Sequence, residues 1–254
     1  MARKKRASII IVIATIVMIA TGYYAFTLFN YDLTSSRAVS TDLNWGGYTV
    51  ASDFNNPQPV ATGVSGAWVV PEVAISQNDT FSAAWIGIGG TFGTDLIQTG
   101  TEQDCINGVA HYSAWFELLP DYAITITTMN ISPGDKINAC IGLSDPNLNV
   151  WTISLIDLTN GESFNQDFEY SSSRLSVEWV IERPVVNNVL SQLADFGTLT
   201  FSNCTAALNG KSDSLKAFPS TKILLSNRQK IQLVDVSSLS SSGSSFTIKY
   251  ICCQ

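Results

Sequence analysis

The sequence has few of the residues on which most hydrolytic sites depend. It contains a single histidine, His111, and no Gly-x-Ser-x-Gly, Asp-Thr-Gly or Asp-Ser-Gly motif. A Ser-His-Asp hydrolase would have to use His111, and an aspartic peptidase needs two matched Asp loops. There is also no Cys-x-x-Cys motif, so we do not expect a zinc site built from cysteine and histidine. These absences argue against the commonest serine, aspartic and zinc hydrolases.

Charged residues are also scarce. Asp, Glu, Lys and Arg together make up 14% of the sequence, and the net charge is -7. An acidic chain of this kind is not expected to bind nucleic acid, whose phosphates require a basic surface. At low pH most carboxylates are protonated, and a surface rich in Ser, Thr and Asn stays soluble without them. The composition therefore fits an acidic habitat.

The one long apolar run lies at the N-terminus. Residues 7–29 carry no charge and follow the basic cluster Arg3-Lys4-Lys5-Arg6. The run is long enough to span a hydrocarbon core of roughly 30 Å, and the basic cluster predicts a cytoplasmic N-terminus. Because Ala20-Thr21-Gly22 is a passable cleavage site, a retained membrane anchor and a cleaved signal peptide both remain open.

The chain therefore divides into three predicted parts. Residues 1–30 form the signal peptide or membrane anchor, residues 31–43 a short polar linker, and residues 44–254 one domain. We expect this domain outside the cell, secreted or anchored to the outer face of the membrane, and we expect a monomer. Membrane contact is expected only through the N-terminal segment, if it is retained.

Five cysteines lie in this predicted extracellular part. They are Cys105, Cys140, Cys204, Cys252 and Cys253, and up to two disulfide bridges would leave one thiol over. The adjacent pair is not expected to bond to itself. The sequence does not determine which cysteines pair.

Short runs rich in Val, Ile, Thr and aromatic residues alternate with clusters of Gly, Asn, Asp, Ser and Pro from Trp45 onward. This texture is typical of strands and turns, and only residues 186–194 suggest a brief helical turn. We predict strands near 46–51, 64–71, 81–88, 94–102, 109–119, 121–129, 135–143, 149–158, 163–169, 174–183, 196–202, 221–226, 231–237 and 244–251. Such a pattern without intervening helices predicts an all-β sandwich of two antiparallel sheets.

Five motifs fall in order along the predicted domain. They are Asn44-Trp45-Gly46-Gly47-Tyr48, Ala84-Trp85-Ile86-Gly87-Ile88-Gly89, Asp95-Leu96-Ile97-Gln98-Thr99-Gly100-Thr101-Glu102, Ala114-Trp115-Phe116-Glu117-Leu118-Leu119-Pro120 and Leu175-Ser176-Val177-Glu178-Trp179-Val180-Ile181-Glu182. In this order and spacing they resemble the glutamic peptidases, also called eqolisins. The resemblance implies a concanavalin-like sandwich with two large bent sheets. It also implies an acid-acting endopeptidase that cleaves proteins or peptides without a metal or organic cofactor and resists pepstatin.

In the glutamic peptidases a Gln and a Glu form the catalytic dyad, and the matching residues here are Gln98 and Glu178. Strand alternation places Val177, Trp179 and Ile181 in the core, so Glu178 points to the opposite face. A carboxylate can take a proton from water and later give it to the leaving amine. The amide of Gln98 can donate to the developing oxyanion. With an ordinary glutamate pKa of roughly 4.3, such a site would work in acid.

The resemblance implies three further site residues and one departure. Glu117 matches a position that supports the dyad, and Trp45 and Trp85 match tryptophans close to it. Gly89 and Gly90 stand where fungal members carry an acidic residue, and the segment leading to Gln98 is one residue shorter. We therefore expect the substrate subsites or the protonation of the dyad to differ from those members.

Two alternatives use the same residues differently. Glu117 and Glu178 would suit a glycosidase, which needs a pair of carboxyl groups, and concanavalin-like sandwiches host such enzymes. A carbohydrate-binding module would instead stack its tryptophans on sugars and bind without Glu178. The context of Gln98 favours the peptidase over both.

Overall fold

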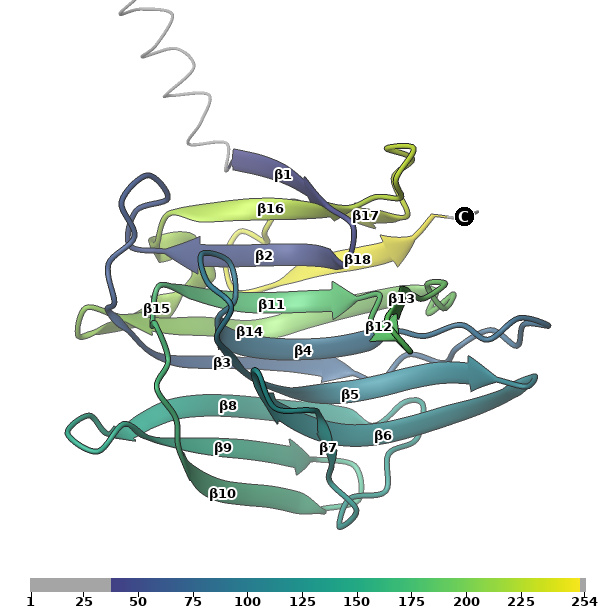
Figure 1. Cartoon of the computed structure of the whole chain (residues 1–254), viewed down its shortest axis with the longest axis horizontal. Helices are drawn as coiled ribbons and strands as arrows, with labels where there is room; N and C mark the ends of the chain where they lie inside the picture. The colour runs from purple at the N-terminus through teal and green to yellow at the C-terminus, as the bar shows by residue number, and fades with distance from the viewer. Residues whose placement is uncertain (1–37, 252–254) are drawn as a thin grey trace, which may run out of the picture. The chain divides into compact units, whose positions relative to one another are not determined.

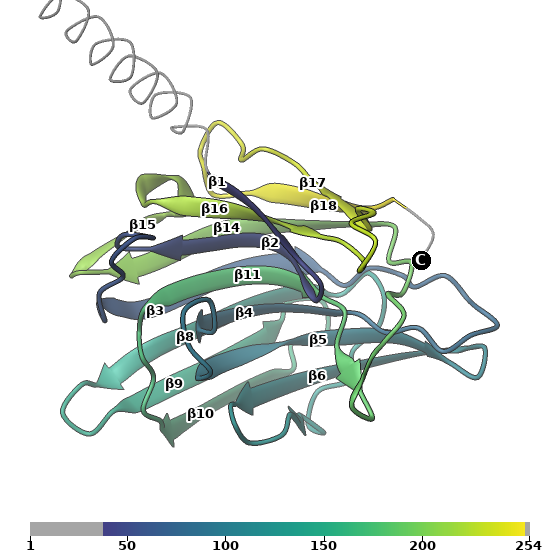
Figure 2. The ribbon, with the colours of Figure 1, turned by 45° about the horizontal axis from the view of Figure 1, so that its top comes forward.

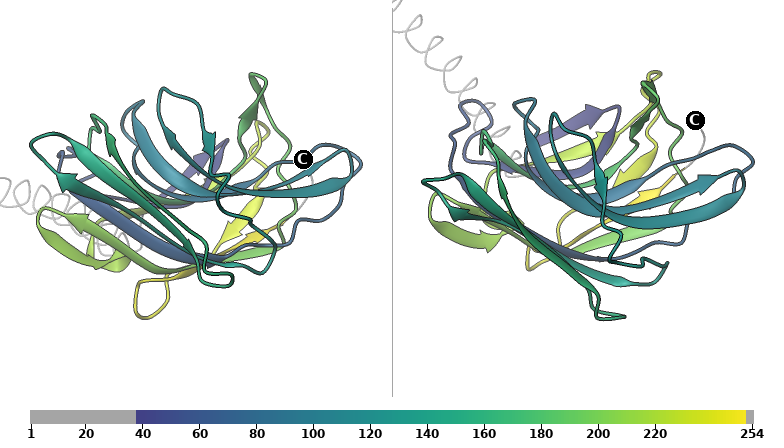
Figure 3. Two further views of the ribbon diagram at one scale, coloured as in Figure 1. Left: turned by 90° about the horizontal axis from the view of Figure 1, so that it is seen from below. Right: turned by 60° about the horizontal axis from the view of Figure 1, so that its bottom comes forward.

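The computed structural model describes residues 38–251, and strands dominate this part of the chain. One sheet has the order β1 (Ala38–Asp42), β16 (Ser220–Leu225), β2 (Trp45–Ala51), β11 (Ser176–Glu182), β4 (Ala83–Gly89), β5 (Leu96–Ile106), β6 (Val109–Leu118) and β7 (Ile124–Thr125). The other has the order β10 (Ser163–Glu169), β9 (Val150–Asp157), β8 (Lys136–Asp145), β3 (Ala61–Val69), β14 (Thr198–Leu208), β18 (Phe246–Tyr250) and β17 (Val234–Val236), with β15 (Lys211–Ser214) paired to β14. Figures 1 and 2 show the strands of the two sheets, and the edge-on views of Figure 3 show the sheets as two curved layers. The prediction of an all-β fold with two large sheets is confirmed.

The segment near residue 186 differs from the prediction. Instead of a helical turn, β12 (Val185–Val186) and β13 (Val189–Leu190) form a hairpin. Asn187 and Asn188 connect the strands with φ of 52° and 62°. Positive φ at both central positions is the geometry of a type I′ turn, and asparagine adopts it more readily than most residues. The helix prediction at residues 186–194 is therefore wrong. The only helix in residues 38–251 is the single 3-10 turn η1 (Leu215–Ala217).

Large aromatic side chains fill the space between the two sheets. Trp179 of β11 is fully buried, and its indole Nε1 donates to the carbonyl oxygen of Ser65 on β3 at 2.8 Å. Trp68 of β3 reaches the other way, and its Nε1 donates to Thr101 Oγ1 on β5 at 3.0 Å. Because each indole buries apolar area and satisfies its N–H, the two tryptophans fix one sheet against the other.

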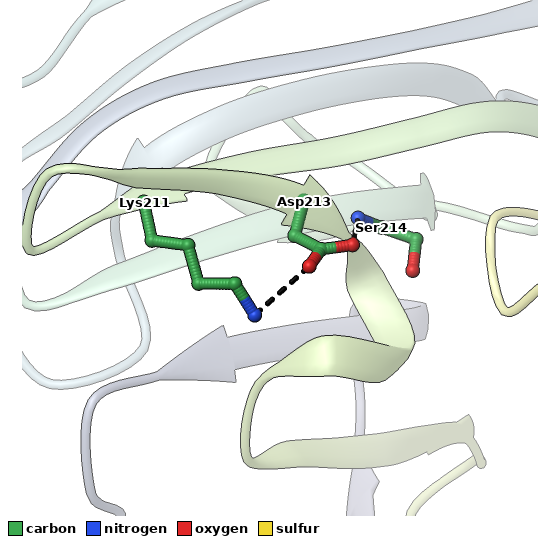
Figure 4. Close-up of polar contacts among 3 residues, drawn as sticks. All are labelled: Lys211, Asp213 and Ser214. Atoms are coloured by element: carbon green, nitrogen blue, oxygen red, sulfur yellow. Dashed lines mark hydrogen bonds and ion pairs between the residues drawn. The ribbon is translucent and has the colours of Figure 1, made fainter.

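The β14–β15 hairpin carries an exposed ion pair on β15. Lys211 Nζ lies 2.8 Å from Asp213 Oδ2, and Asp213 Oδ1 accepts a hydrogen bond from the backbone N–H of Ser214 at 2.7 Å (Figure 4). Both charged side chains are more than a third exposed. Salt bridges in such solvated positions contribute little to stability.

Several predicted features lie partly or wholly outside the described residues. These are the targeting segment at 1–30, most of the linker at 31–43, Cys252 and Cys253. Ala38–Asp42, within the predicted linker, forms β1. Cys105, Cys140 and Cys204 are free thiols, so no disulfide joins any two of them. Residues 38–251 include no helix with the length and apolar character to cross a bilayer.

Candidate active site

Strand register brings Gln98 and Glu178 into one row across the first sheet. Glu178 on β11 lies opposite Gly87 on β4, and Gly87 lies opposite Gln98 on β5. Thr49 on β2 continues the row beyond Glu178, and Glu117 on β6 continues it beyond Gln98. Neighbouring strands are about 4.8 Å apart, so the two backbones of the predicted dyad are separated by about 10 Å. The residue between them in this row is Gly87, which has no side chain.

The position above Gly87 is already filled. A Cβ built on Gly87 would lie 2.8 Å from Cδ1 of Leu96 and 3.0 Å from Cζ3 of Trp85. Leu96 reaches over Gly87 from the neighbouring strand β5 and Trp85 from β4 itself, and both side chains are buried. A side chain at position 87 would therefore collide with them. The same two groups occupy the place between Gln98 and Glu178.

Gln98 is held by Glu117. Its side chain is only 4% exposed, and its Nε2 donates to Glu117 Oε2 at 2.5 Å. An amide nitrogen carries two hydrogens, so one N–H remains for another acceptor. The carbonyl oxygen Oε1 of Gln98 is buried and has no hydrogen-bond partner. Glu117 therefore fixes the amide while leaving a donor and an acceptor free.

Glu178 is completely buried on the face opposite the inter-sheet core. Its Oε1 accepts a hydrogen bond from Thr91 Oγ1 at 2.7 Å, and Thr49 Oγ1 lies 3.4 Å from the same oxygen. Its Oε2 has no partner, and no hydrogen bond joins it to Gln98. Burial raises the pKa of Glu178 to about 8, although hydrogen bonds from Ser176, Thr91 and Thr49 oppose the rise. The expectation of an ordinary pKa near 4.3 is thus wrong for this arrangement.

The β4–β5 loop covers Glu178. Gly89 and Gly90 have φ of 117° and 54°, and Gly90 N donates to the carbonyl oxygen of Asp95 at 2.7 Å. A side chain on Gly89 would strike the backbone of Asp95, so both the conformation and the close approach require glycine. Asp95 Oδ2 in turn accepts the N–H of Ser173 at 2.5 Å. This tight loop places Thr91 over the carboxyl group.

A cavity of about 550 Å³ opens beside the row. Gln98, Glu117 and Tyr122 line it, together with Val185 and Val186 of the β12–β13 hairpin. Tyr122 is 91% exposed, so its ring is free to contact a ligand. Glu178 is not among the lining residues. The two predicted dyad residues therefore differ, since Gln98 faces the cavity and Glu178 lies beneath the loop.

Other carboxyl groups line the same cavity. Burial raises the pKa of Glu182 to about 7, although Trp85 Nε1 donates to its Oε2 at 2.8 Å. Burial also raises the pKa of Asp104 to about 7, and the charge of the neighbouring Glu102 adds to that rise. The pKa values of Glu102 and Glu117 are raised mainly by burial. All of these groups therefore favour the protonated form in acid.

The predicted tryptophans lie together beside the row. The rings of Trp45 and Trp85 meet edge to face, with centroids 5.0 Å apart and an interplanar angle of 78°. Trp45 lines the cavity, whereas Trp85 is fully buried beneath it. Of the five predicted site residues, Trp45, Gln98 and Glu117 face the cavity. Glu178 and Trp85 are fully buried and do not line it.

Sequence reasoning missed several polar residues of this face. Alternation places Glu182 on the same face as Glu178 and Glu102 on the same face as Gln98, so the sequence pattern could have predicted these carboxyl groups as part of the site. No sequence pattern could have predicted Thr91, because its contact with Glu178 depends on how the loop folds back. Thr49 depends on the pairing of β2 with β11, which the pattern of either strand alone does not reveal.

Comparison with known proteins identifies the group to which this site belongs. The sequence model of the Peptidase A4 family matches residues 43–250. The chain belongs to the Peptidase A4 family. The predicted membership of the glutamic peptidases and the assignment as an endopeptidase are confirmed at this level.

Individual relatives of this Peptidase A4 chain are distant in sequence but match it over most of their length. It is 28% identical to aspergillopepsin-2 from Aspergillus niger over 85% of this chain and 78% of that protein. It is 26% identical to scytalidopepsin B from Scytalidium lignicola over 85% of this chain and 81% of that protein. The structure matches scytalido-glutamic peptidase bound to a transition-state analogue inhibitor with a TM-score of 0.68 and 25% identity, over 83% of this chain and 99% of that one.

Proposed function

We propose that this Peptidase A4 chain cleaves proteins at acidic pH through Glu178, as general base and acid, and Gln98, as oxyanion stabiliser. The observation that carries the proposal is the row across Gly87. At its two sides, Gln98 Oε1 and Glu178 Oε2 are buried acceptors without partners. Two such oxygens can accept both hydrogens of one water molecule, which is how a nucleophilic water is oriented.

The reaction then follows from the free groups of the two side chains. Ionised Glu178 takes a proton from the water as its oxygen bonds to the scissile carbonyl carbon. The free N–H of Gln98 donates to the oxyanion that forms, while Glu117 holds the other N–H. When the carbon–nitrogen bond breaks, Glu178 returns the proton to the leaving amine. The products are a carboxylic acid and an amine, and no step uses a metal ion or organic cofactor.

The proposal requires that substrate binding changes the surroundings of Glu178. With a pKa of about 8 the buried carboxyl is protonated in acid and cannot act as a base. A peptide that displaces Leu96 from above Gly87 would admit water and lower the cost of charge on Glu178. The same displacement would place the scissile bond between the two dyad residues.

Substrate contacts follow from the lining of the cavity. Trp45 and Tyr122 offer aromatic surface, and the hairpin at residues 185–186 offers aliphatic surface. Such walls suit the side chains of an unfolded protein segment. We further propose that the sandwich is of the concanavalin-like type and that the enzyme acts as a monomer outside the cell.

The test is degradation of an unfolded protein by the purified full-length chain across pH 2–7, with pepstatin and a chelator present. Wild type is compared with Glu178→Gln and Gln98→Ala. We expect acid-only cleavage by wild type and losses of about 100-fold or more in kcat for both variants, as is usual for acid–base and oxyanion groups. Full activity of a folded Glu178→Gln protein would reject the dyad. An inactive but folded wild type would favour the glycan-directed alternatives.

A further inference from the structure

A chain of hydroxyl groups leads to the buried oxygen of Glu178. Thr49 Oγ1 and Thr91 Oγ1 lie 2.8 Å apart, and Thr91 Oγ1 lies 2.7 Å from Glu178 Oε1. The two threonines come from β2 and from the β4–β5 loop, on different sides of the carboxyl group. Ser176, two residues before Glu178 on β11, donates its hydroxyl hydrogen to the carbonyl oxygen of Gly89 and accepts the backbone N–H of Thr91 at 3.4 Å.

The donors of this chain can be assigned for the ionised form of Glu178. A carboxylate only accepts, so the hydroxyl hydrogen of Thr91 must point to Oε1. Thr91 then accepts the hydroxyl hydrogen of Thr49. Thr49 lies 3.4 Å from Oε1, too far to replace Thr91 in its present position. Thr91 therefore makes the shortest hydroxyl contact with the carboxylate, and Thr49 orients Thr91.

We propose that Thr91 is a positioning residue for Glu178, holding one carboxylate oxygen so that the other oxygen is presented to water. This proposal rests on the proposed function of Glu178. Oε2 is the oxygen without a partner, which agrees with this division of roles. The glycines at positions 89 and 90 serve the same purpose, because their backbone conformation brings Thr91 down onto the carboxyl group.

The groups that face Glu178 are neutral. They are hydroxyls from β2, the loop and β11, together with the N–H of Thr91. Three carboxyl groups lie in the same part of the sheet: Asp95 in the loop that covers Glu178, Glu182 farther along β11, and Glu117 beyond Gln98. None of them, and no Lys, Arg or His, is among the main causes of the shifted pKa of Glu178. The charged form of Glu178 therefore depends on hydrogen bonds from these neutral groups.

Removing the Thr91 hydroxyl should consequently make Glu178 harder to ionise. Losing one hydrogen bond to a charged group reduces the ionisation constant about tenfold, which raises the pKa by about one pH unit. In Thr91→Val, the acidic limb of the kcat profile should move up by about one pH unit. Its kcat in acid should fall about tenfold, while KM stays within about threefold. Thr91→Ser, which restores a hydroxyl, should recover the wild-type profile.

Two further variants serve as an intermediate case and a control. Thr49→Val leaves Thr91 in place but removes the hydroxyl that donates to it, so the acidic limb of the kcat profile should also move up, by a smaller amount. Thr221→Val is the matched control, because Thr221 is paired with Thr49 one strand farther from Glu178 and is similarly buried. It should leave the profile unchanged. Thr49→Val also keeps the test informative should Thr91→Val fold poorly.

Infrared titration separates this proposal from the catalytic role of Glu178. The carboxyl band that is absent from Glu178→Gln belongs to Glu178, and its pH midpoint can be followed in every threonine variant without any activity. An upward midpoint in Thr91→Val, with recovery in Thr91→Ser, supports the proposal even if Glu178→Gln stays active and the dyad fails. An unchanged midpoint and an unchanged kcat profile in Thr91→Val would overturn it, even with Glu178→Gln inactive.

Discussion

Glu178 and Asp213 are both strand carboxyl groups, and their surroundings shift their pKa values in opposite directions. Glu178 lies under a loop with only hydroxyl and amide donors around it, and burial raises its pKa to about 8. Asp213 lies in solvent on the β14–β15 hairpin, where Lys211 and the N–H of Ser214 lower its pKa. Glu178 thus resembles the cavity carboxyls Glu182 and Asp104, whose pKa values are about 7. The difference shows that burial favours the protonated carboxyl at the site, whereas neighbouring donors favour the ionised carboxylate of Asp213.

The largest predicted effect of this difference is on stability against pH. For Glu178, Glu182 and Asp104 the folded pKa lies above the unfolded one, so the folded state binds more protons between about pH 4 and pH 8. The free energy of unfolding should therefore fall as pH rises through that window. The total fall should be several kcal/mol, because each pH unit between a folded and an unfolded pKa is worth about 1.4 kcal/mol. Urea unfolding at pH 4, 6 and 8 measures it. A stability that rises towards pH 8 would contradict the account.

A second prediction isolates Glu178. Because Glu178→Gln keeps the shape of the side chain and cannot ionise, the loss of stability between pH 5 and pH 8 should shrink by a few kcal/mol. Asp213→Asn is the surface control and should leave the slope in this window unchanged. Equal slopes in wild type and Glu178→Gln would mean that Glu178 does not hold its proton in the folded state.

A third prediction concerns the glycine between the dyad residues. The added methyl of Gly87→Ala would press on Leu96 and Trp85, and overpacking of this kind costs about 1–3 kcal/mol. Gly142→Ala on β8 is the matched control, since a Cβ there meets nothing within 4 Å. It should be neutral or stabilise by about 0.5 kcal/mol. The melting temperatures of the two variants measure this difference. An unchanged melting temperature in Gly87→Ala would show that the position above Gly87 is open.

The smallest effect is expected at the surface ion pair. Lys211→Met removes the cation that lies 2.8 Å from Asp213. Because both side chains are solvated, the melting temperature should not change measurably, while the pKa of Asp213 should rise towards its ordinary range. NMR titration of the Asp213 carboxyl measures its pKa. A clear drop in melting temperature would show that the hairpin contributes more to stability than its exposure suggests.

Much of the fold follows from local patterns. Alternation in β11 predicted that Val177, Trp179 and Ile181 enter the core, and all three are fully buried. The β12–β13 hairpin was misread because two consecutive asparagines suit either a loop or a type I′ turn. The extended run at residues 121–129 forms only the two-residue strand β7.

The site was less accessible to prediction than the fold. The residues Gln98 and Glu178 were identified by resemblance, but their alignment across Gly87 depends on how β11 pairs with β4, from which it is far apart in sequence. The burial of Glu178 depends on the path of the loop that carries Thr91. Alternation along a strand shows which face of the sheet a side chain occupies. The pKa of that side chain depends on which other segments cover the face, and the sequence does not show this directly.

The most direct test of the account compares Glu178 with a buried carboxyl group that lies beside the other sheet. Asp135, beside β8, is 7% exposed and accepts the N–H of Ser132, whereas Glu178 lies in the row of the proposed dyad. The measurement is kcat for an unfolded protein substrate from pH 2 to pH 7 in wild type, Glu178→Gln and Asp135→Asn. The account predicts that Glu178→Gln loses about 100-fold or more and that Asp135→Asn keeps the wild-type profile. Cleavage by Glu178→Gln at the wild-type rate would contradict it.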